Sequence, residues 1–194
     1  MSLSPIYSNQ INEYWILVTG GFSVGKTEFI RSISEYDEWD MSDYPKELGK
    51  WLSPHGRIDL DDHTTLCLYQ PPPSLRFSTI FDISTNQHIT NWIGTIFITS
   101  NYIDAEFSLP EANNIIQSTL MVLNIPYLVA VNLWDTAPSI SSAGGRNSLL
   151  TFEQVVEQLE VETNIPILPC VAKDKASVQQ VVLALMDEII KSAL

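Results

Sequence analysis

The sequence predicts an α/β domain in which helices cover both faces of a mostly parallel six-stranded sheet. Three observations lead to this fold class. Apolar runs of strand length alternate with amphipathic runs of helical length, which is the pattern of β-α-β units. The apolar runs are rich in Ile, Leu and Val, as expected of strands that are buried on both faces. A glycine-rich turn joins the first apolar run to the first amphipathic run.

The elements can be placed along the chain in order. Strands are expected at residues 14–19, 57–60, 65–69, 93–99, 127–132 and 165–171. Helices are expected where apolar residues recur at three- and four-residue spacing, at residues 26–35, 110–123, 152–162 and 176–192. A chain of 194 residues suits one domain, because domains commonly have about 100 to 200 residues. We therefore expect a single domain over residues 1–194.

Three stretches show neither periodicity and are expected to be loops. Residues 36–56 are polar and aromatic, residues 70–90 open with three prolines after a glutamine, and residues 136–148 are small and polar. Long loops within a compact domain are usually functional. The first two are therefore candidates for segments that face a ligand, and the third is expected to be a surface insertion.

The charge and the apolar pattern exclude several classes of function. Acidic side chains outnumber basic ones 23 to 10, a formal net charge of -13. A nucleic-acid-binding surface is therefore not expected. No apolar run reaches the roughly 18 residues of a membrane span, and neither a secretion signal nor a lipidation motif is present. We expect a cytoplasmic protein without direct membrane insertion, in which Cys67 and Cys170 are buried, reduced thiols.

The most informative segment is a phosphate-binding signature that begins where the first strand ends. Residues 20–27 read GGFSVGKT and fit the P-loop pattern G-x-x-x-x-G-K-T. Glycines let the backbone curl so that N–H groups point at a phosphate, and the start of the following helix adds N–H groups and its dipole. The residues expected at the phosphates are Gly20, Phe22, Ser23, Val24, Gly25, Lys26, Thr27 and Glu28.

Four of these side chains raise separate expectations. Lys26 is expected to bridge the β- and γ-phosphate oxygens, and the Thr27 hydroxyl is expected to ligate Mg²⁺. Phe22 is expected close to the γ-phosphate. Glu28 has two interpretations, because an acidic residue in a first helical turn ordinarily stabilises the helix, whereas beside a bound nucleotide it would weaken affinity.

Two short motifs follow later strands. Asn132-Leu133-Trp134-Asp135 ends one expected strand, and Val171-Ala172-Lys173 ends another. Either motif alone is typical of a simple turn. In an open parallel sheet, however, ligands bind beyond the carboxyl ends of the strands, where the P-loop and both motifs are expected. A carboxylate at Asp135 can accept hydrogen bonds from N1–H and the exocyclic amine of guanine, a donor pattern that adenine lacks.

The order GGFSVGKT, NLWD and VAK over almost the whole chain resembles the prokaryotic Ras-like small GTPases that work with roadblock-type partners, the gliding protein MglA and its relatives. The resemblance implies the small G-protein variant of the P-loop NTPase fold, GTP or GDP with Mg²⁺ as ligands, and a roadblock/LC7-type protein partner. It also implies a guanine site formed by Asn132, Leu133, Asp135, Ala172 and Lys173. Asn132 would support the base loop, Asp135 would read guanine, and the Ala172 N–H would meet the guanine carbonyl. Leu133 stands where most such proteins have lysine.

The segments that sense the γ-phosphate depart from this family. After the strand at residues 65–69, the family's D-x-x-G-Q is replaced by QPPPS. Gln70 stands at the acidic position, Pro73 at the glycine without an N–H to donate, and Ser74 at the water-orienting glutamine. No threonine lies between Asp37 and His55. Because phosphoryl transfer depends on positioning and charge stabilisation, we expect GTP hydrolysis to be weak or absent, and we assign no catalytic residue.

Three functions stay open on this basis. The first is a guanine-nucleotide-binding protein that acts in signalling or as a regulatory scaffold. The second is an enzyme, either a GTPase completed by a partner's residues or an ATP-dependent kinase that uses the same P-loop. The third is an interaction domain whose P-loop is vestigial. The histidines His55, His63 and His88 show no metal-ligand spacing, and the acidic cluster around His63 is expected to be a solvated turn.

Overall fold

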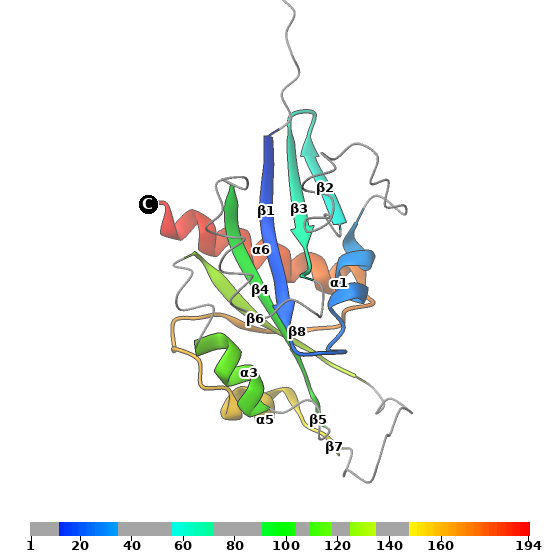
Figure 1. The fold of residues 1–194 in the computed structure, drawn as a ribbon, viewed down its shortest axis with the longest axis vertical. Coiled ribbons are helices and arrows are strands. Elements are labelled where there is room, and N and C mark those ends of the chain that lie inside the picture. Colours follow the sequence, from blue (N-terminus) through cyan, green and yellow to red (C-terminus); the bar gives the residue numbers. More distant parts are fainter. Residues whose placement is uncertain (1–11, 35–55, 72–90, 104–108, 118–124, 135–147) are drawn as a thin grey trace, which may run out of the picture.

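The centre of the fold is a sheet of six strands in the order β2-β3-β1-β4-β6-β8 (Figure 1). The computed structural model describes residues 12–34, 56–71, 91–103, 109–117, 125–134 and 148–194. The strands are β1 (Asn12–Gly20), β2 (Gly56–Asp61), β3 (Thr64–Tyr69), β4 (Trp92–Ser100), β6 (Tyr127–Asn132) and β8 (Ile167–Cys170). β2 and β3 pair antiparallel, whereas the other neighbours pair parallel. The predicted, mostly parallel sheet is therefore confirmed.

Helices cover both faces of this sheet, as predicted. On one face, α1 (Lys26–Ile33) and α6 (Lys175–Ser192) pack against an apolar cluster that includes Ile96 and Ile98 of β4. On the other face, α3 (Leu109–Ile115) and α5 (Phe152–Gln158) pack against a second cluster that includes Phe97. Successive side chains of a strand point to opposite faces, so adjacent residues of β4 belong to different clusters. Figure 1 shows α3 and α5 together on one side of the sheet.

Side chains satisfy free backbone groups at the start of α6 and at the end of α5. The Asp174 carboxylate accepts a hydrogen bond from the Ala176 N–H at 3.0 Å and caps the start of α6. The sequence predicts that the helix at residues 152–162 continues beyond Gln158, but α5 ends there. The buried side chain of Asn113 explains this end, because it donates to the Gln158 carbonyl at 3.1 Å and accepts from the Glu160 N–H at 3.0 Å.

A small second sheet is a feature that the sequence does not predict. β5 (Tyr102–Ile103) and β7 (Ser148–Leu149) pair antiparallel. β7 begins at the last residue of the expected loop at 136–148, whose other residues lie outside the described chain. Strands of two residues carry no periodicity from which a pattern can be recognised. This short sheet continues from the end of β4.

The turn between β2 and β3 is acidic and exposed, as predicted. The His63 N–H donates to the Asp61 carboxylate at 2.7 Å, and this bond lowers the pKa of Asp61. Within the described ranges, no group of three or more His, Cys, Asp or Glu side chains could hold a metal ion. His55 and His88 lie outside these ranges.

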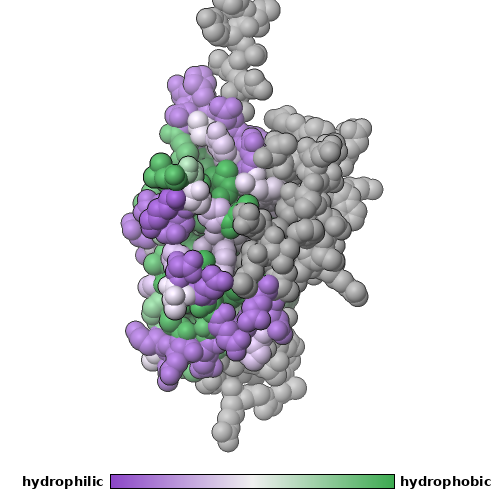
Figure 2. Space-filling view, turned by 90° about the vertical axis from the view of Figure 1, so that its left-hand side faces the viewer, coloured by the Kyte–Doolittle hydropathy of each residue, from purple (hydrophilic) through white to green (hydrophobic). Residues whose placement is uncertain are grey.

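The surface of the described part mixes polar and apolar residues. Figure 2 shows hydrophilic residues toward both ends of one side of the molecule, with hydrophobic and hydrophilic residues interspersed between them. The exposed large apolar residues of the C-terminal segment include Leu183, Ile190 and Leu194. Isolated exposure of this kind is ordinary in folded domains. No helix among the described residues combines the length and the apolar character needed to cross a membrane.

Candidate functional site

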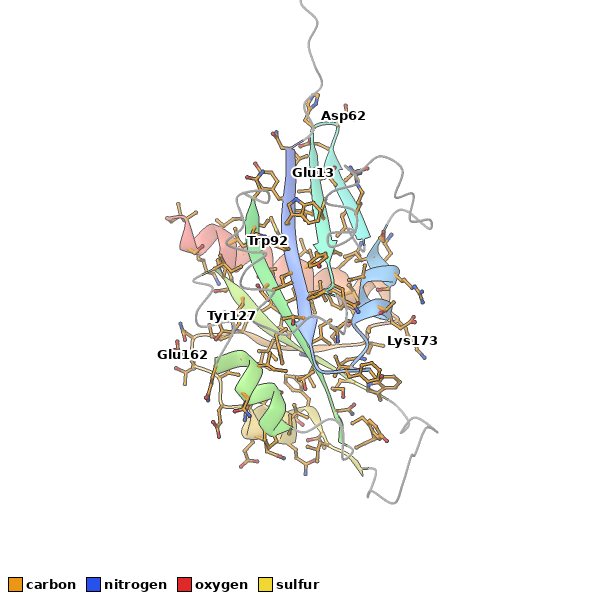
Figure 3. All side chains as sticks on the ribbon, viewed as in Figure 1. Glu13, Asp62, Trp92, Tyr127, Glu162 and Lys173 are labelled. Atoms are coloured by element: carbon orange, nitrogen blue, oxygen red, sulfur yellow. The ribbon has the colours of Figure 1, made fainter. Side chains whose placement is uncertain are left out.

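The P-loop, residues 20–27, joins the carboxyl end of β1 to the start of α1. β1 lies between β3 and β4 in the sheet, so the P-loop leaves the sheet near its centre. The segments that follow β6 and β8 leave at the same edge, because these strands run parallel to β1. Figure 3 shows Lys173, which follows β8, toward this end of the sheet and Glu13 and Asp62 toward the opposite end. All predicted site residues that are described therefore lie at one edge.

Two glycines allow the P-loop to turn where it does. Gly20 has a φ of 138°, and a Cβ there would lie 1.9 Å from the Ile98 carbonyl oxygen. Gly25 has a φ of 102°, and a Cβ there would lie 2.4 Å from Nδ2 of Asn132. Side chains are excluded at both positions by conformation and by space. Ser23 also has a positive φ, 52°, a conformation that is uncommon for residues other than glycine.

Lys26 folds its side chain back over the loop. Its Nζ donates to the Gly20 carbonyl at 3.2 Å and also to the Gly21 carbonyl. Burial removes water from the ammonium group and lowers the pKa of Lys26 to about 8. A phosphate held beside the ammonium group would favour its charged form and raise this pKa again. The site therefore offers a desolvated cation held by neutral carbonyl oxygens, an arrangement suited to an anion.

Thr27 and Gln70 bring the start of α1 and the end of β3 together. The Thr27 hydroxyl donates to Oε1 of Gln70 at 3.2 Å, and the contact is exposed. A hydroxyl that donates its proton in this way keeps a lone pair free for a cation, and oxygen atoms are the ligands that Mg²⁺ takes. The role of Thr27 as a magnesium ligand stays a prediction, and its exposed hydroxyl is an oxygen atom that could hold the ion. Gln70 contributes a neutral amide in place of a carboxylate.

Phe22 and Glu28 have exposed side chains at the two ends of the loop. Phe22 is 64% exposed. Glu28 forms an ion pair with Arg31 at 3.5 Å, one helical turn further along α1. This pair supports the interpretation of Glu28 as a residue that stabilises the helix surface. Because its carboxylate already has a cationic neighbour, its repulsion of a phosphate is reduced.

Asn132 connects the P-loop to the two segments expected at the base. Its side chain is 6% exposed. Nδ2 donates to the Val24 carbonyl at 3.0 Å, and Oδ1 accepts from the Ala172 N–H at 3.0 Å. One buried amide therefore fixes the relative positions of the ends of β1, β6 and β8. A buried polar group left without its partner is costly, so these three segments are held together firmly.

The bond to Asn132 changes the expected role of Ala172. The sequence predicts that the Ala172 N–H meets a guanine carbonyl, but in the structure it donates to Oδ1 of Asn132. The physical reason is burial: Ala172 is 3% exposed, and the buried amide oxygen beside it needs a donor. Lys173 is the next residue and is exposed. Its N–H is the next backbone donor along this segment.

The described part of the NLWD motif ends at Trp134, so Asp135 lies outside it. The Leu133 N–H donates to the Cys170 carbonyl at 2.8 Å, which ties the motif to β8. The Leu133 side chain packs against the apolar cluster under α3 and α5. Leu133 therefore contributes to the core.

Sequence reasoning missed a further residue of this site, Asn101. It follows β4 directly and is 6% exposed. Its Oδ1 accepts from the Trp134 N–H at 2.7 Å. Asn132 was identified as the first residue of the NLWD motif at the end of an expected strand, and Asn101 likewise is a polar residue that follows a buried strand. It went unrecognised because no motif includes it.

Comparisons with known proteins show the fold. No protein-family model and no curated protein matches the chain. Among solved structures, the chain is similar to the G-domain of FeoB from Methanococcus jannaschii, with 12% identity and a TM-score of 0.50, covering 92% of this chain and 99% of that one. It is also similar to the translation elongation factor SelB from Methanococcus maripaludis in its apo form, with 13% identity and a TM-score of 0.54, over 93% of this chain.

The chain covers 34% of the SelB chain, so it spans about a third of that protein's length. At these identities the likeness concerns the fold alone. The fold, a mostly parallel six-stranded sheet with helices on both faces, is the one found in the FeoB G-domain, as the sequence predicts. The individual site residues still rest on the geometry described above.

Proposed function

We propose that this chain binds a guanine nucleotide, GTP or GDP, together with Mg²⁺, and acts in signalling or as a regulatory scaffold. The observation that carries the proposal is the buried Asn132 amide, which joins Val24 of the P-loop to Ala172 beyond β8. A loop that only bound phosphate would not need a fixed distance to the ends of β6 and β8. A nucleotide does, because its phosphates and its base are recognised by different loops.

The phosphate end of the proposed site is formed by the P-loop. The ammonium group of Lys26 neutralises phosphate charge, and the backbone between Gly20 and Gly25 supplies N–H donors. Phe22, Ser23 and Val24 belong to this curved segment. Glu28 lies in the first turn of α1, at the helix start that faces the phosphates in this proposal. Mg²⁺, held by the Thr27 hydroxyl, would neutralise the charge of the phosphate oxygens.

The base end of the proposed site consists of Asp135 and the segment after β8. Asp135 accepts from N1–H and the exocyclic amine of guanine, and it follows Trp134, whose backbone is held in place by Asn101. The Lys173 N–H, rather than that of Ala172, donates to the guanine carbonyl. A buried site that pairs with these polar groups discriminates strongly against a base that lacks them.

We propose in addition that hydrolysis is weak or absent. Gln70 supplies an amide where the family that this sequence resembles has a carboxylate. Its Oε1 already accepts a hydrogen bond from the Thr27 hydroxyl. Pro73, Ser74 and residues 37–55 complete the sequence argument and lie outside the described chain. A cytoplasmic location and a roadblock/LC7-type partner are proposed from the sequence and its family resemblance.

Base preference tests the proposal. Labelled GDP is displaced from the wild-type chain by GTP but not by ATP, and the Asp135→Ala variant loses this preference. Asp187→Ala, which removes an exposed carboxylate on α6, is the matched control and keeps it. Equal displacement by ATP would reject guanine recognition. Failure of the chain to bind labelled GDP would favour the vestigial P-loop.

Phosphate release from GTP tests the proposal that hydrolysis is weak or absent. The isolated chain is expected to release phosphate slowly or not at all over hours. Rapid multiple turnover by the isolated chain would contradict the proposed loss of hydrolysis. Turnover that begins only when a partner protein is added would identify a GTPase completed by that partner.

A further inference from the structure

We propose that Asn101 is a positioning residue that holds the backbone of Trp134, the residue before Asp135, and thereby supports the preference for guanine. This inference rests on the proposed function, because it concerns the base end of the same site. Asn101 follows β4, the strand between β1 and β6 in the sheet. It makes no predicted contact with a ligand. Its effect passes through the backbone of the NLWD motif.

The side chain of Asn101 holds the backbone of Trp134 on both sides. Oδ1 accepts from the Trp134 N–H at 2.7 Å, while Nδ2 lies 3.4 Å from the Trp134 carbonyl oxygen. Nδ2 also donates to the Leu150 carbonyl at 3.2 Å, at the end of β7. Oδ1 and Nδ2 of Asn101 thus face the N–H and the carbonyl of Trp134, as backbone groups of a neighbouring strand would. Trp134 is the residue immediately before Asp135.

The backbone of Asn101 completes the attachment. Its N–H donates to the Asn132 carbonyl at 3.2 Å, and its carbonyl accepts from the Leu150 N–H at 2.9 Å. Asn101 thus contacts the NLWD motif before and after Leu133. The Leu133 N–H itself is bound to the Cys170 carbonyl at 2.8 Å. Through these bonds the motif is fixed up to the position from which Asp135 leaves.

Only an amide side chain of this length makes these contacts. Asparagine carries an acceptor and two donor hydrogens on one short group. An aspartate at residue 101 would keep the acceptor for the Trp134 N–H but would face the Trp134 and Leu150 carbonyls with a negative charge. An alanine would leave these part-buried groups of Trp134 and Leu150 without this partner, and a loss of that kind is costly.

A second buried asparagine provides a matched control. Asn113 on α3 is 8% exposed, and its amide joins the Gln158 carbonyl and the Glu160 N–H at the end of α5. Asn113→Ala therefore removes a comparable set of buried bonds away from the NLWD motif. A purely structural role of Asn101 would make the two alanine variants behave alike. A positioning role would separate them by base selectivity.

The experiment measures GDP and ADP affinity for the wild type, Asn101→Ala and Asn113→Ala. In Asn101→Ala, GDP affinity is expected to fall by at least about tenfold, the loss typical of one hydrogen bond to a charged group, while ADP affinity stays unchanged. Asn113→Ala is expected to keep the wild-type ratio. In a double-mutant cycle, Asn101→Ala adds nothing to Asp135→Ala, because both act through the same carboxylate. An unchanged GDP-to-ADP ratio in Asn101→Ala, or full additivity, would overturn the proposal.

A second readout does not need a nucleotide. Hydrogen exchange of the Trp134 backbone N–H is expected to be at least about tenfold faster in Asn101→Ala than in the wild type or Asn113→Ala, since its acceptor has been removed. An unchanged exchange rate would show that Asn101 does not hold this backbone and would overturn the inference on its own. If the wild type binds neither nucleotide, the proposed function fails, and Trp134 exchange alone decides whether Asn101 fixes the loop.

Discussion

At the base end of the candidate site, the buried amides of Asn101 and Asn132 bind backbone groups of four segments, whereas at the metal end a single exposed contact joins Thr27 to Gln70 at 3.2 Å. Buried amide bonds are costly to break, but an exposed bond competes with water and contributes little. The comparison indicates that the segments of the proposed base end are held together by the protein's own buried amides. Among the described residues, the hydrogen bond between Thr27 and Gln70 that joins the P-loop to the end of β3 is exposed and therefore weak.

The largest effect is expected at the base end, from Asn132→Ala. The change leaves the Val24 carbonyl and the Ala172 N–H without their buried partner. We expect a loss of about 3 kcal/mol in the free energy of unfolding, from one to two unsatisfied buried groups. Urea unfolding of the nucleotide-free chain measures it. A loss below about 1 kcal/mol would mean that the base end is not held as described.

The pH dependence of GDP affinity tests the proposed contact between the Lys26 ammonium group and the phosphates. The pKa of Lys26 in the free chain is about 8, below its ordinary value of 10.5, because the ammonium group is buried. The phosphate binds the charged form, so GDP affinity is expected to fall as pH rises above 8, by up to about tenfold per pH unit. Titrations at several pH values measure this fall, and Lys26→Gln is expected to show none of it. The same fall in Lys26→Gln would assign it to another group.

The lowered pKa of Lys26 also fixes the sign of a stability change. Between pH 8 and 10.5 the unfolded lysine keeps its proton while the folded one loses it. The free energy of unfolding of the nucleotide-free chain therefore gains a contribution as pH rises through this window. This contribution is the difference between the wild type and Lys26→Gln, measured by urea unfolding across the same pH range.

A smaller effect is expected at the metal end. Gln70→Ala removes one exposed hydrogen bond to Thr27 and should change the free energy of unfolding by no more than about 0.5 kcal/mol. Gln70→Glu places a carboxylate beside the Thr27 hydroxyl and should make GDP affinity depend more strongly on Mg²⁺. Affinities measured with Mg²⁺ and with a chelator reveal the difference. A destabilisation by Gln70→Ala as large as that of Asn132→Ala would remove the contrast between the two ends.

The smallest effect is expected from Glu28→Gln. Both side chains of the Glu28–Arg31 pair are more than half exposed, at 52% and 64%, so the pair contributes at most about 0.5 kcal/mol to stability. We expect GDP affinity to change less than about twofold, because Arg31 already offsets the carboxylate charge. A large gain in GDP affinity would show that Glu28 repels the phosphates.

The sequence predicted those parts of the molecule whose cause is local. The P-loop required Gly20 and Gly25, and the structure gives a reason for each: a positive φ and a close neighbour. The six strands followed from apolar runs, which burial on both faces produces. Asn132 was found because it opens the NLWD motif at the end of an expected strand. In each case a few consecutive residues contain the whole signal.

The rest depends on contacts between segments that are distant in sequence. α5 ends early because Asn113 binds its last turn, and the Ala172 N–H is occupied by Asn132. Asn101 acts on Trp134, which lies 33 residues further along the chain. No local pattern records such pairings. The sequence therefore predicted which segments meet at this end of the sheet but not which of their backbone groups are already hydrogen-bonded to each other.

The central claim is that the base end, fixed by buried amides, selects guanine. Calorimetric titration of the nucleotide-free wild type with GDP and with ADP, both in the presence of Mg²⁺, tests it most directly. GDP is expected to bind at least about a hundredfold more tightly than ADP, because a site built to pair with the polar groups of one base rejects a base that lacks them. Equal affinities, or no heat with either nucleotide, would contradict the account.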